Sequence, residues 1–410
     1  MDQHPQARFI IDTLHQAGFI AYYAGGWVRD FLLQHPSDDI DIATNAPPET
    51  IQALFPHTVP IGISFGIILV IVGGHQYEVA TFRRDLGYSD GRRPTQIEFS
   101  RAEEDAKRRD FTINGMFYDP LHEEVLDYVG GRGDLAAGII RAIGDPHERI
   151  KEDRLRMIRA IRLSCRFGFK IEPRTAAAIR AHATELFPAV AIERIVQELT
   201  KGIAFGSLDK MLLSLHEYGL LAAIFPEAHT LSIKELQQRL EPLSHYPKMA
   251  PLISFLLPLF PEMKEEEQLS FCKRLKLSNS EQQFALYLHR ARELLNRAKP
   301  AENVEWAYFY ANSFCRICLE VLAAHLKKER REPFLKSHEE RMHALHQAID
   351  RVKKNNPVIN GDDLKKEGIP PGKSLGMLLK EAEKISFNEG IFEPVLIIER
   401  LKKSSLWPRI

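Results

Sequence analysis

The chain has 410 residues, of which 44% are hydrophobic and 27% charged, a composition typical of a soluble globular protein with room for about two to four domains. The 55 Lys/Arg and 55 Asp/Glu residues balance, so a polyanionic partner would have to be bound by local basic patches. Four cysteines in so long a chain exclude a disulfide framework. Because no apolar stretch is long enough to span a bilayer and no signal-peptide pattern is present, we expect a cytoplasmic protein with no membrane partner.

Short helices and strands alternate over the first part of the chain. The patterns predict helices at 6–17, 28–34 and 48–55, and strands at 20–24, 39–44, 66–72 and 76–81. Gly73 and Gly74, which separate the last two strands, predict a β-hairpin. The connections are too short for repeated parallel crossovers, so we expect a small antiparallel or mixed sheet with helices.

Beyond about residue 141 the strand signals fade and apolar residues recur at helical spacing nearly to the end. The predicted fold class is therefore α+β, with a mixed domain followed by helical ones. We expect four parts, at residues 1–140, 141–200, 201–350 and 351–410. The segment 141–180 contains 11 Lys/Arg and 5 Asp/Glu residues, a local excess of six positive charges, which supplies the basic patch that a polyanion needs.

Two aspartates one residue apart in a β-branched run carry most of the chemical information. In a strand Asp39 and Asp41 face the same side, while Ile40 and Ile42 face the core. Two carboxylates on one exposed face repel each other unless a cation lies between them. We therefore predict Mg²⁺ bound by these aspartates and accompanied by a nucleoside triphosphate. Glu78, on a paired strand, is the natural third catalytic carboxylate, although it is also compatible with an ordinary exposed glutamate.

A glycine pair precedes the helix that leads to these aspartates. Gly25 and Gly26 allow close approach of the backbone to a ligand, and the following helix N-terminus presents free N–H groups to phosphate. Such a pair is usually only a turn, but together with Arg29 and the aspartates it predicts a triphosphate cradle. We expect ribose or phosphate contacts from three polar residues at the start of a later apolar stretch, Arg109, Asp110 and Asn114.

Residues 152–162 are predicted to form one helix rich in arginine. Asp153 and Arg156 are three residues apart and share a face, which Arg159 and Arg162 continue. A pair of this kind is usually a surface ion pair. A carboxylate beside a guanidinium is also what recognition of a base's Watson–Crick edge requires, and Arg159 is placed to take a phosphate.

The ordered set of these motifs resembles the class II tRNA nucleotidyltransferases, a family related to bacterial poly(A) polymerases. The matching segments are Gly25–Asp30, Asp39–Thr44, Glu78–Arg83, Arg108–Asn114, Gly130–Leu135, Glu152–Arg156 and Ile192–Ile195. They cover the first 200 residues. The segment Asn360–Gly372 is also similar to the end of these enzymes that binds the tRNA elbow, and nearby lysines could contact phosphates.

This resemblance implies a polymerase-β-like nucleotidyltransferase palm followed by an all-α neck, body and tail. It implies that Asp39 and Asp41 bind Mg²⁺ and activate the 3′ hydroxyl of tRNA to attack the α-phosphate of CTP or ATP. Asp153 and Arg156 would hydrogen-bond the incoming base. Residues 83–101, including Asp90, Gly91, Arg92 and Arg93, are similar to the family's flexible loop. One departure is Gly115, where the family commonly has alanine.

Related activities stay open at this point. A poly(A) polymerase would use the same palm, although residues 62–66 match the tRNA enzymes better. An enzyme that adds only A is also compatible with the motifs, whereas the segment 83–101 argues against one that adds only CC. A non-catalytic RNA-binding protein on a degenerate palm would be expected to lack a metal carboxylate, and none is missing. The oligomeric state is not fixed by the sequence.

Overall fold

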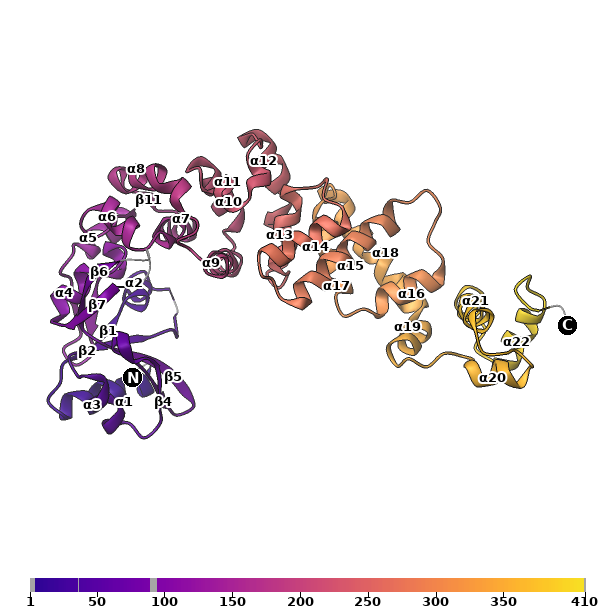
Figure 1. Cartoon of the computed structure of the whole chain (residues 1–410), viewed down its shortest axis with the longest axis horizontal. Coiled ribbons are helices and arrows are strands. Elements are labelled where there is room, and N and C mark those ends of the chain that lie inside the picture. The colour runs from indigo at the N-terminus through magenta and orange to yellow at the C-terminus, as the bar shows by residue number, and fades with distance from the viewer. Residues whose placement is uncertain (1–3, 36, 89–93, 409–410) are drawn as a thin grey trace. The chain divides into compact units, whose positions relative to one another are not determined.

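The structure is a computed structural model that describes residues 4–35, 37–88 and 94–408. It divides into two compact units, Met1–Gln238 and Arg239–Ile410. The strands of the described residues all belong to the first unit, and the second unit is helical (Figure 1). Within the described ranges, no helix combines the length and the apolar character needed to cross a membrane.

The first unit is built on a mixed sheet that, in the described residues, has seven strands in the order β3-β4-β5-β2-β1-β8-β9. The strands are β1 (Ala21–Ala24), β2 (Asp41–Thr44), β3 (Thr58–Gly62), β4 (Ile67–Val72), β5 (His75–Thr81), β8 (Phe117–Asp119) and β9 (Glu124–Leu126). Only β2 and β5 pair in parallel among these strands. The expected mixed sheet is therefore confirmed.

Helices cover this sheet and continue the first unit beyond it (Figure 1). They are α1 (Pro5–Gln16), α2 (Gly26–Leu32), α3 (Pro48–Leu54), α4 (Ala102–Lys107), α5 (Gly131–Ala137), α6 (Pro146–Glu152), α7 (Leu155–Phe167), α8 (Pro173–His182), α9 (Ile192–Ala204), α10 (Leu208–Glu217) and α11 (Leu220–Ile224). A further helix, α12 (Ile233–Leu240), runs across the division between the units. The three helices predicted near the N-terminus are confirmed to within two residues at each end.

The β4–β5 hairpin has the predicted connection. Val72 pairs with His75, and the two intervening residues, Gly73 and Gly74, have φ angles of +58° and +81°. Two consecutive positive φ values are what a tight hairpin turn requires, and glycine adopts them without a steric penalty.

Two predicted elements differ from the structure. The segment 83–101 is not simply a loop, because β6 (Arg83–Tyr88) and β7 (Pro94–Phe99) form an antiparallel ladder; the intervening Asp90, Gly91, Arg92 and Arg93 lie outside the described residues. The single helix predicted at 152–162 is broken between α6 and α7, because Asp153 has an extended backbone and its carboxylate accepts a hydrogen bond from Leu155 N at 3.1 Å. This is how an aspartate commonly begins a new helix.

One strand of a short parallel pair, β11 (Lys170–Ile171), also lies in the region after residue 141 that was predicted to be helical. It pairs with β10 (Ile139–Ile140) across α6 and α7. Each strand has only two residues, which is too short to produce a recognisable alternation of apolar and polar side chains in the sequence.

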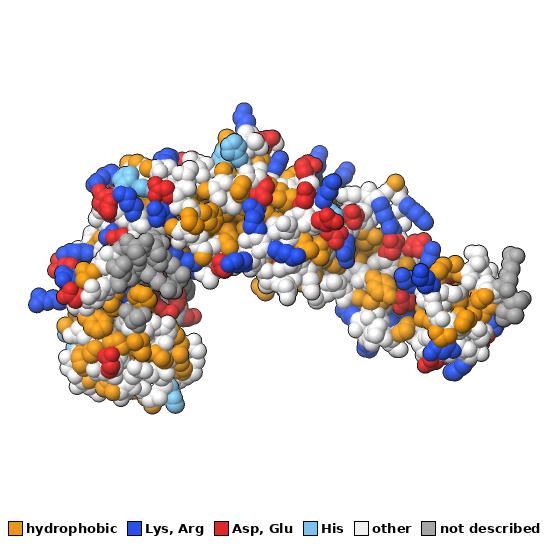
Figure 2. Space-filling model, in the orientation of Figure 1, with side chains coloured by type: hydrophobic (Ala, Val, Ile, Leu, Met, Phe, Trp, Pro, Cys, Tyr) orange, Lys and Arg blue, Asp and Glu red, His pale blue; other side chains and the backbone are white. Residues whose placement is uncertain are grey.

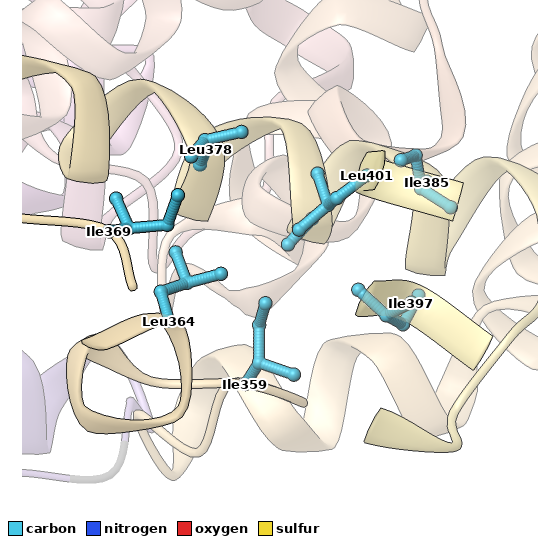
Figure 3. Packing of buried hydrophobic residues seen from close by; sticks show 8 residues of the cluster. Ile359, Leu364, Ile369, Leu378, Ile385, Ile397 and Leu401 are labelled. Atoms are coloured by element: carbon cyan, nitrogen blue, oxygen red, sulfur yellow. The ribbon is translucent and has the colours of Figure 1, made fainter. Parts of the chain in front are cut away.

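The second unit consists of helices in its described part. They are α13 (Leu252–Leu256), α14 (Glu265–Arg274), α15 (Asn279–Asn296), α16 (Asn303–Ala311), α17 (Cys315–Ala324), α18 (Lys328–Ala344), α19 (His346–Lys353), α20 (Gly361–Lys366), α21 (Lys373–Glu389) and α22 (Pro394–Lys402). The last three helices enclose a hydrophobic cluster of their own (Figure 3). Its buried members are Ile359, Leu364, Ile369, Leu378, Ala382, Ile385, Ile397 and Leu401.

Charged side chains of both signs are interspersed over the face seen in Figure 2. This agrees with the equal numbers of basic and acidic residues in the chain. A strongly basic binding surface therefore has to be sought locally, in a recess of the first unit.

Candidate active site

A cavity of about 790 Å³ in the first unit brings together every site residue predicted from the sequence. Those residues are Gly25, Gly26, Arg29, Asp39, Asp41, Glu78, Arg109, Asp110, Asn114, Asp153, Arg156, Arg159 and Arg162. They come from the sheet and the residues beside it, from the helix after β1, from the segment between α4 and β8, from the break after α6 and from α7. Residues separated by more than a hundred positions in the chain therefore face one space.

The sheet places the three carboxylates through its register. Asp41 pairs with Ala24, the residue before Gly25, so the aspartate lies beside the glycine pair. In the parallel ladder Ile42 pairs with Val79, which makes Asp41 and Glu78 neighbours on adjacent strands. The predicted alternation of buried and exposed side chains is confirmed, since Ile40 is 3% and Ile42 0% exposed while Asp39 is exposed. The strand itself begins only at Asp41.

Gly25 permits the close approach between these elements. Its φ of +69° lies in the left-handed region, and an added Cβ would lie 3.1 Å from Arg109 Nη1 and 3.6 Å from Asp41 Oδ2. A side chain at this position would be strained and would also intrude between a cation and a carboxylate. The glycine thus keeps the floor of the cavity open to a ligand.

The carboxylate cluster has the electrostatics of a cation site. Asp41 reaches solvent but lies in a recess, and this desolvation, followed by the charges of Glu78 and Asp39, raises the pKa of Asp41 to about 6, against the opposing effect of Arg109. Oxygen ligands with uncompensated negative charge suit a hard divalent cation. No three His, Cys, Asp or Glu side chains of the described ranges form a ready-made metal cage. The residues therefore fit an ion held by one or two carboxylates together with substrate phosphates and water, as is common for Mg²⁺.

Buried carboxylates hold the arginines of the cavity in fixed positions. Asp105, in α4 and 1% exposed, accepts hydrogen bonds from Arg108 at 2.7 Å and from Arg109 at 3.0 Å. Burial alone would raise the pKa of Asp105, but these two guanidinium groups, together with hydrogen bonds, lower it below its ordinary value. The aspartate consequently stays charged and orients both arginines.

A second network joins the sheet domain to α7. Asp110 accepts from Arg159 Nη2 at 2.7 Å and from Asn114 Nδ2 at 3.0 Å, and Asn114 Oδ1 accepts from Arg29. Although burial opposes it, the charge of Arg159 and the hydrogen bonds lower the pKa of Asp110. Arg159, predicted to contact a phosphate, is paired with Asp110. It would therefore reach a phosphate through its remaining donors.

The proposed base-reading pair is arranged differently from the predicted ion pair. Asp153 is bound in bidentate fashion by Arg194, at 3.1 and 2.7 Å, whereas Arg156 donates to Glu152 at 2.7 Å. The break between α6 and α7 separates Asp153 from the face on which a continuous helix would have placed it. Both side chains nevertheless line the cavity and are held rigidly by their own partners.

Eight lining residues were not among the predicted site residues: Trp27, Asp30, Ser37, Arg108, Arg166, Arg194, Lys201 and Phe205. Arg166 could have been found, because it continues the helical spacing of Arg159 and Arg162. Arg108 adjoins the predicted Arg109. Lys201 and Phe205 carry no such signal, since only the packing of α9 against α7 brings them to the cavity (Figure 1).

The balance of charge suits a nucleoside triphosphate. Nine Lys/Arg and six Asp/Glu side chains occur among the described residues that line the cavity, an excess of three positive charges. Three of the carboxylates, Asp30, Asp110 and Asp153, are paired with arginines of the cavity. Asp39, Asp41 and Glu78 remain to hold a metal ion, and the excess of positive charge suits phosphates.

Comparisons with known proteins agree with this site. The poly A polymerase head domain matches residues 21–141, the family "Probable RNA and SrmB- binding site of polymerase A" matches residues 168–231, and tRNA nucleotidyltransferase domain 2 matches residues 250–391. The CCA-adding enzyme of Pediococcus pentosaceus is 34% identical over 401 residues, which cover 93% of each chain. This chain belongs to the CCA-adding enzyme family.

Two further members of the CCA-adding enzyme family illustrate the likeness. The enzyme of Anoxybacillus flavithermus is 43% identical over 230 residues, 56% of this chain and 57% of that protein. The crystal structure of the Bacillus stearothermophilus enzyme in complex with CTP has a TM-score of 0.80 and 28% identity, and the match covers 98% of both chains. The expected polymerase-β-like nucleotidyltransferase fold with a helical remainder is thereby confirmed. Enzymes of this class generally use a divalent metal.

Proposed function

We propose that this protein adds the sequence CCA to the 3′ end of tRNA, using CTP and ATP and releasing pyrophosphate. The observation that carries the proposal is the single cavity in which Asp39, Asp41 and Glu78 face the arginines and the pair Asp153 and Arg156. The curated relatives are CCA-adding enzymes, which supports complete CCA addition rather than addition of A alone or of a poly(A) tail.

The chain's own residues would divide the work by position. Asp39 and Asp41 are proposed to hold Mg²⁺, with Glu78 as the third carboxylate beside them. The backbone of Gly25 and Gly26, at the N-terminus of α2, receives the triphosphate. The bound metal would supply charge stabilisation and help to ionise the attacking 3′ hydroxyl. The protein's contribution to the rate is then mainly positioning and electrostatics.

The arginines and their partners would orient the nucleotide. Six residues are proposed to contact phosphates or ribose, each through the atoms that its own hydrogen bonds leave available: Arg29, Arg109, Asp110, Asn114, Arg159 and Arg162. Asp153 and Arg156 are proposed to read the base, one as an acceptor and the other as a donor. Because both are fixed by neighbours in the protein, they can select a base without a nucleic-acid template.

We also propose the division into palm (1–140), neck (141–200), body (201–350) and tail (351–410). The palm is supported by the head-domain match at residues 21–141. The boundary between the two compact units follows Gln238, which lies within the proposed body. The tail is supported by its separate hydrophobic cluster, and its exposed lysines could contact tRNA phosphates.

The decisive experiment supplies tRNA transcripts that end before CCA, after C and after CC, each with CTP, ATP or both, and sequences the product ends. Completion of all three to a single CCA is the expected result. Addition only of A to the CC-ended transcript would indicate an A-adding enzyme, and long A tails would indicate a poly(A) polymerase.

The carboxylates are tested with Asp39→Ala and Asp41→Ala in the same assay. We expect each change to reduce nucleotide addition by at least about a thousandfold, because the metal site is lost, while the affinity for tRNA is unchanged. The matched control is Asp38→Ala, which changes an exposed neighbouring carboxylate that does not line the cavity. Near-normal activity in the Asp39 and Asp41 variants would place the metal site elsewhere.

A further inference from the structure

The end of α9 brings an aromatic ring and a cation to the margin of the cavity. Lys201 and Phe205 are four residues apart, so they lie on the same side of the helix end, and both line the cavity. Phe205 is 42% exposed, and the side chain of Lys201 is 52% exposed. Neither residue is among those proposed above to bind the metal ion or the nucleotide.

The backbone around Phe205 has a defined conformation at the end of α9. Gly206 has a φ of +64°, and its N–H donates to Ile203 O at 2.9 Å; Ser207 N donates to Gly202 O, also at 2.9 Å. This pattern is a common way to end a helix with a left-handed glycine. The turn therefore fixes the backbone of Phe205, the residue before that glycine, and with it the direction in which the side chain leaves the helix.

The ring is also connected to the rest of the site through Arg166. The guanidinium carbon of Arg166 lies 3.8 Å from the centroid of the Phe205 ring, and Arg166 Nη2 donates to Asp30 Oδ2 at 3.0 Å. Asp30 is in turn paired with Arg29. The Phe205 ring is thus connected through Arg166 and Asp30 to Arg29 of the triphosphate cradle. The part of the ring that Arg166 does not cover is exposed and can contact a second partner.

We propose that Phe205 stacks on a base near the single-stranded 3′ end of the RNA and that Lys201 contacts an adjoining phosphate. This assignment rests on the proposed function. Sites for single strands combine aromatic rings, on which bases stack, with cations that follow the backbone. The other aromatic residue among the described lining residues, Trp27, is only 6% exposed and packs against Tyr23 and Phe31, so it offers no comparable platform.

The existing partner of Lys201 does not prevent this role. Lys201 Nζ lies 3.3 Å from Glu198 Oε1, but an ion pair with an exposed lysine contributes little and is readily exchanged. Glu198 remains neutralised by the buried Arg162 when the lysine moves away. Lys201 can therefore turn to a phosphate without leaving an unpaired buried charge.

The test measures steady-state kinetics with CTP and a tRNA transcript that ends before CCA. Phe205→Leu is expected to raise KM for the RNA about tenfold, equivalent to about 1.4 kcal/mol, while KM for CTP and kcat stay within about twofold. Phe205→Trp, which keeps an aromatic face, is expected to retain the KM of the original protein. The matched control is Phe9→Leu, because Phe9 is 53% exposed and does not line the cavity.

Lys201 is tested through the salt dependence of the same KM. Lys201→Ala is expected to reduce the slope of log KM for the RNA against log salt concentration by about 0.7, the loss of one contact to a single-strand phosphate, and Lys201→Arg to restore it. An unchanged slope would show that Lys201 does not contact an RNA phosphate.

Stacking is measured directly, without nucleotide addition, by placing 2-aminopurine at each of the last two positions of the RNA in turn. Binding should quench the fluorescence at one of these positions with the original protein and with Phe205→Trp, but not with Phe205→Leu. An unchanged KM for the RNA in Phe205→Leu, or a rise in KM for CTP instead, would overturn the proposal. If the original protein added no nucleotide at all, the proposed function would fail, and the fluorescence experiment would still decide the stacking.

Discussion

Two glycines in α5 illustrate how single residues shape the site. A Cβ at Gly131 would lie 2.3 Å from the backbone oxygen of Thr112 and 2.8 Å from Met116 Cγ. Thr112 belongs to the short segment that also carries Asn114 of the cavity, and its hydroxyl donates to Asp134 Oδ2 at 2.7 Å. The absence of a side chain at Gly131 thus lets α5 support the segment behind Asn114.

We therefore expect Gly131→Ala to lower the free energy of unfolding by about 1–3 kcal/mol, because the backbone of Thr112 has to move. Gly133→Ala, in the same helix and with no atom within 4 Å of the added Cβ, should instead be neutral or stabilise by up to about 1 kcal/mol. Urea unfolding of both variants measures the difference. Equal effects would show that the contact with Thr112 is not what requires the glycine.

Gly115 is a related case that the sequence left unexplained. An added Cβ there would lie 2.7 Å from Val129 Cγ2 and 3.0 Å from Ile143 Cδ1. The side chains of Val129 and Ile143 thus occupy the space that the methyl group of an alanine at this position would need.

At the scale of elements, α4 presents its buried and exposed charges on different sides. Asp105 points inward to Arg108 and Arg109, whereas Glu103 pairs with Lys107 at the surface, where its side chain is 56% exposed. The inward carboxylate orients two cavity arginines, and the outward one makes an ordinary surface pair.

Asp105→Asn is expected to lower the free energy of unfolding by about 3 kcal/mol, because two largely buried arginines lose their partner. KM for CTP should rise as Arg109 loses its fixed orientation. The control Glu103→Gln, on the exposed side of the same helix, should leave the stability essentially unchanged, because a surface ion pair contributes little. Urea unfolding and CTP kinetics on both variants provide the comparison, and equal behaviour would contradict the role of Asp105.

The same buried carboxylates predict how stability depends on pH. The pKa values of Asp105, Asp110 and Glu198 are lowered in the folded protein, while in the unfolded chain they are about 4. The stabilisation they provide is thus complete above pH of about 4 and is lost as the pH falls through the folded values, because the unfolded chain then binds more protons. Urea unfolding between pH 7 and pH 3 should show this decline, with a shallower slope for Asp105→Asn. A constant stability down to pH 3 would refute the assignment.

At the scale of the whole molecule, the candidate active site and the C-terminal hydrophobic cluster belong to different units. The cavity residues all lie before residue 206, in the first unit, whereas the cluster shown in Figure 3 lies in the second. The helices α20 to α22 share this cluster, and α21 also packs on α16, where Phe387 joins Ala307 and Ala348. The order of α20 and α22 therefore depends on the shared cluster.

Leu378→Ala, at a fully buried member of the cluster, should lower the opening free energy of residues 359–402 by about 2–5 kcal/mol. Met377→Ala is the control, since Met377 directly precedes Leu378 and is 51% exposed. Hydrogen exchange measured by mass spectrometry should show faster exchange in α20 to α22 for the first variant only. Equally fast exchange in the strands β1, β2 and β5 would mean that the cluster does not stabilise the tail independently.

The sequence by itself determined most of the local elements and indicated many of the residues that line the cavity. The alternation around Asp39 and Asp41, the turn at Gly73 and Gly74, and the helical spacing of the arginines are local patterns, which depend only on neighbours in the chain. For this reason the mixed sheet, the hairpin and many of the residues that line the cavity could be predicted before the fold was known.

Only the tertiary structure decided which side chains are partners. Asp153 pairs with Arg194 and not with Arg156, because a break in the helix turns it toward α9. Arg159 is occupied by Asp110, 49 residues away, and Phe205 reaches the cavity through the packing of α9. These contacts join residues far apart in the chain, and they are fixed by how the helices and the sheet pack, which no local spacing encodes.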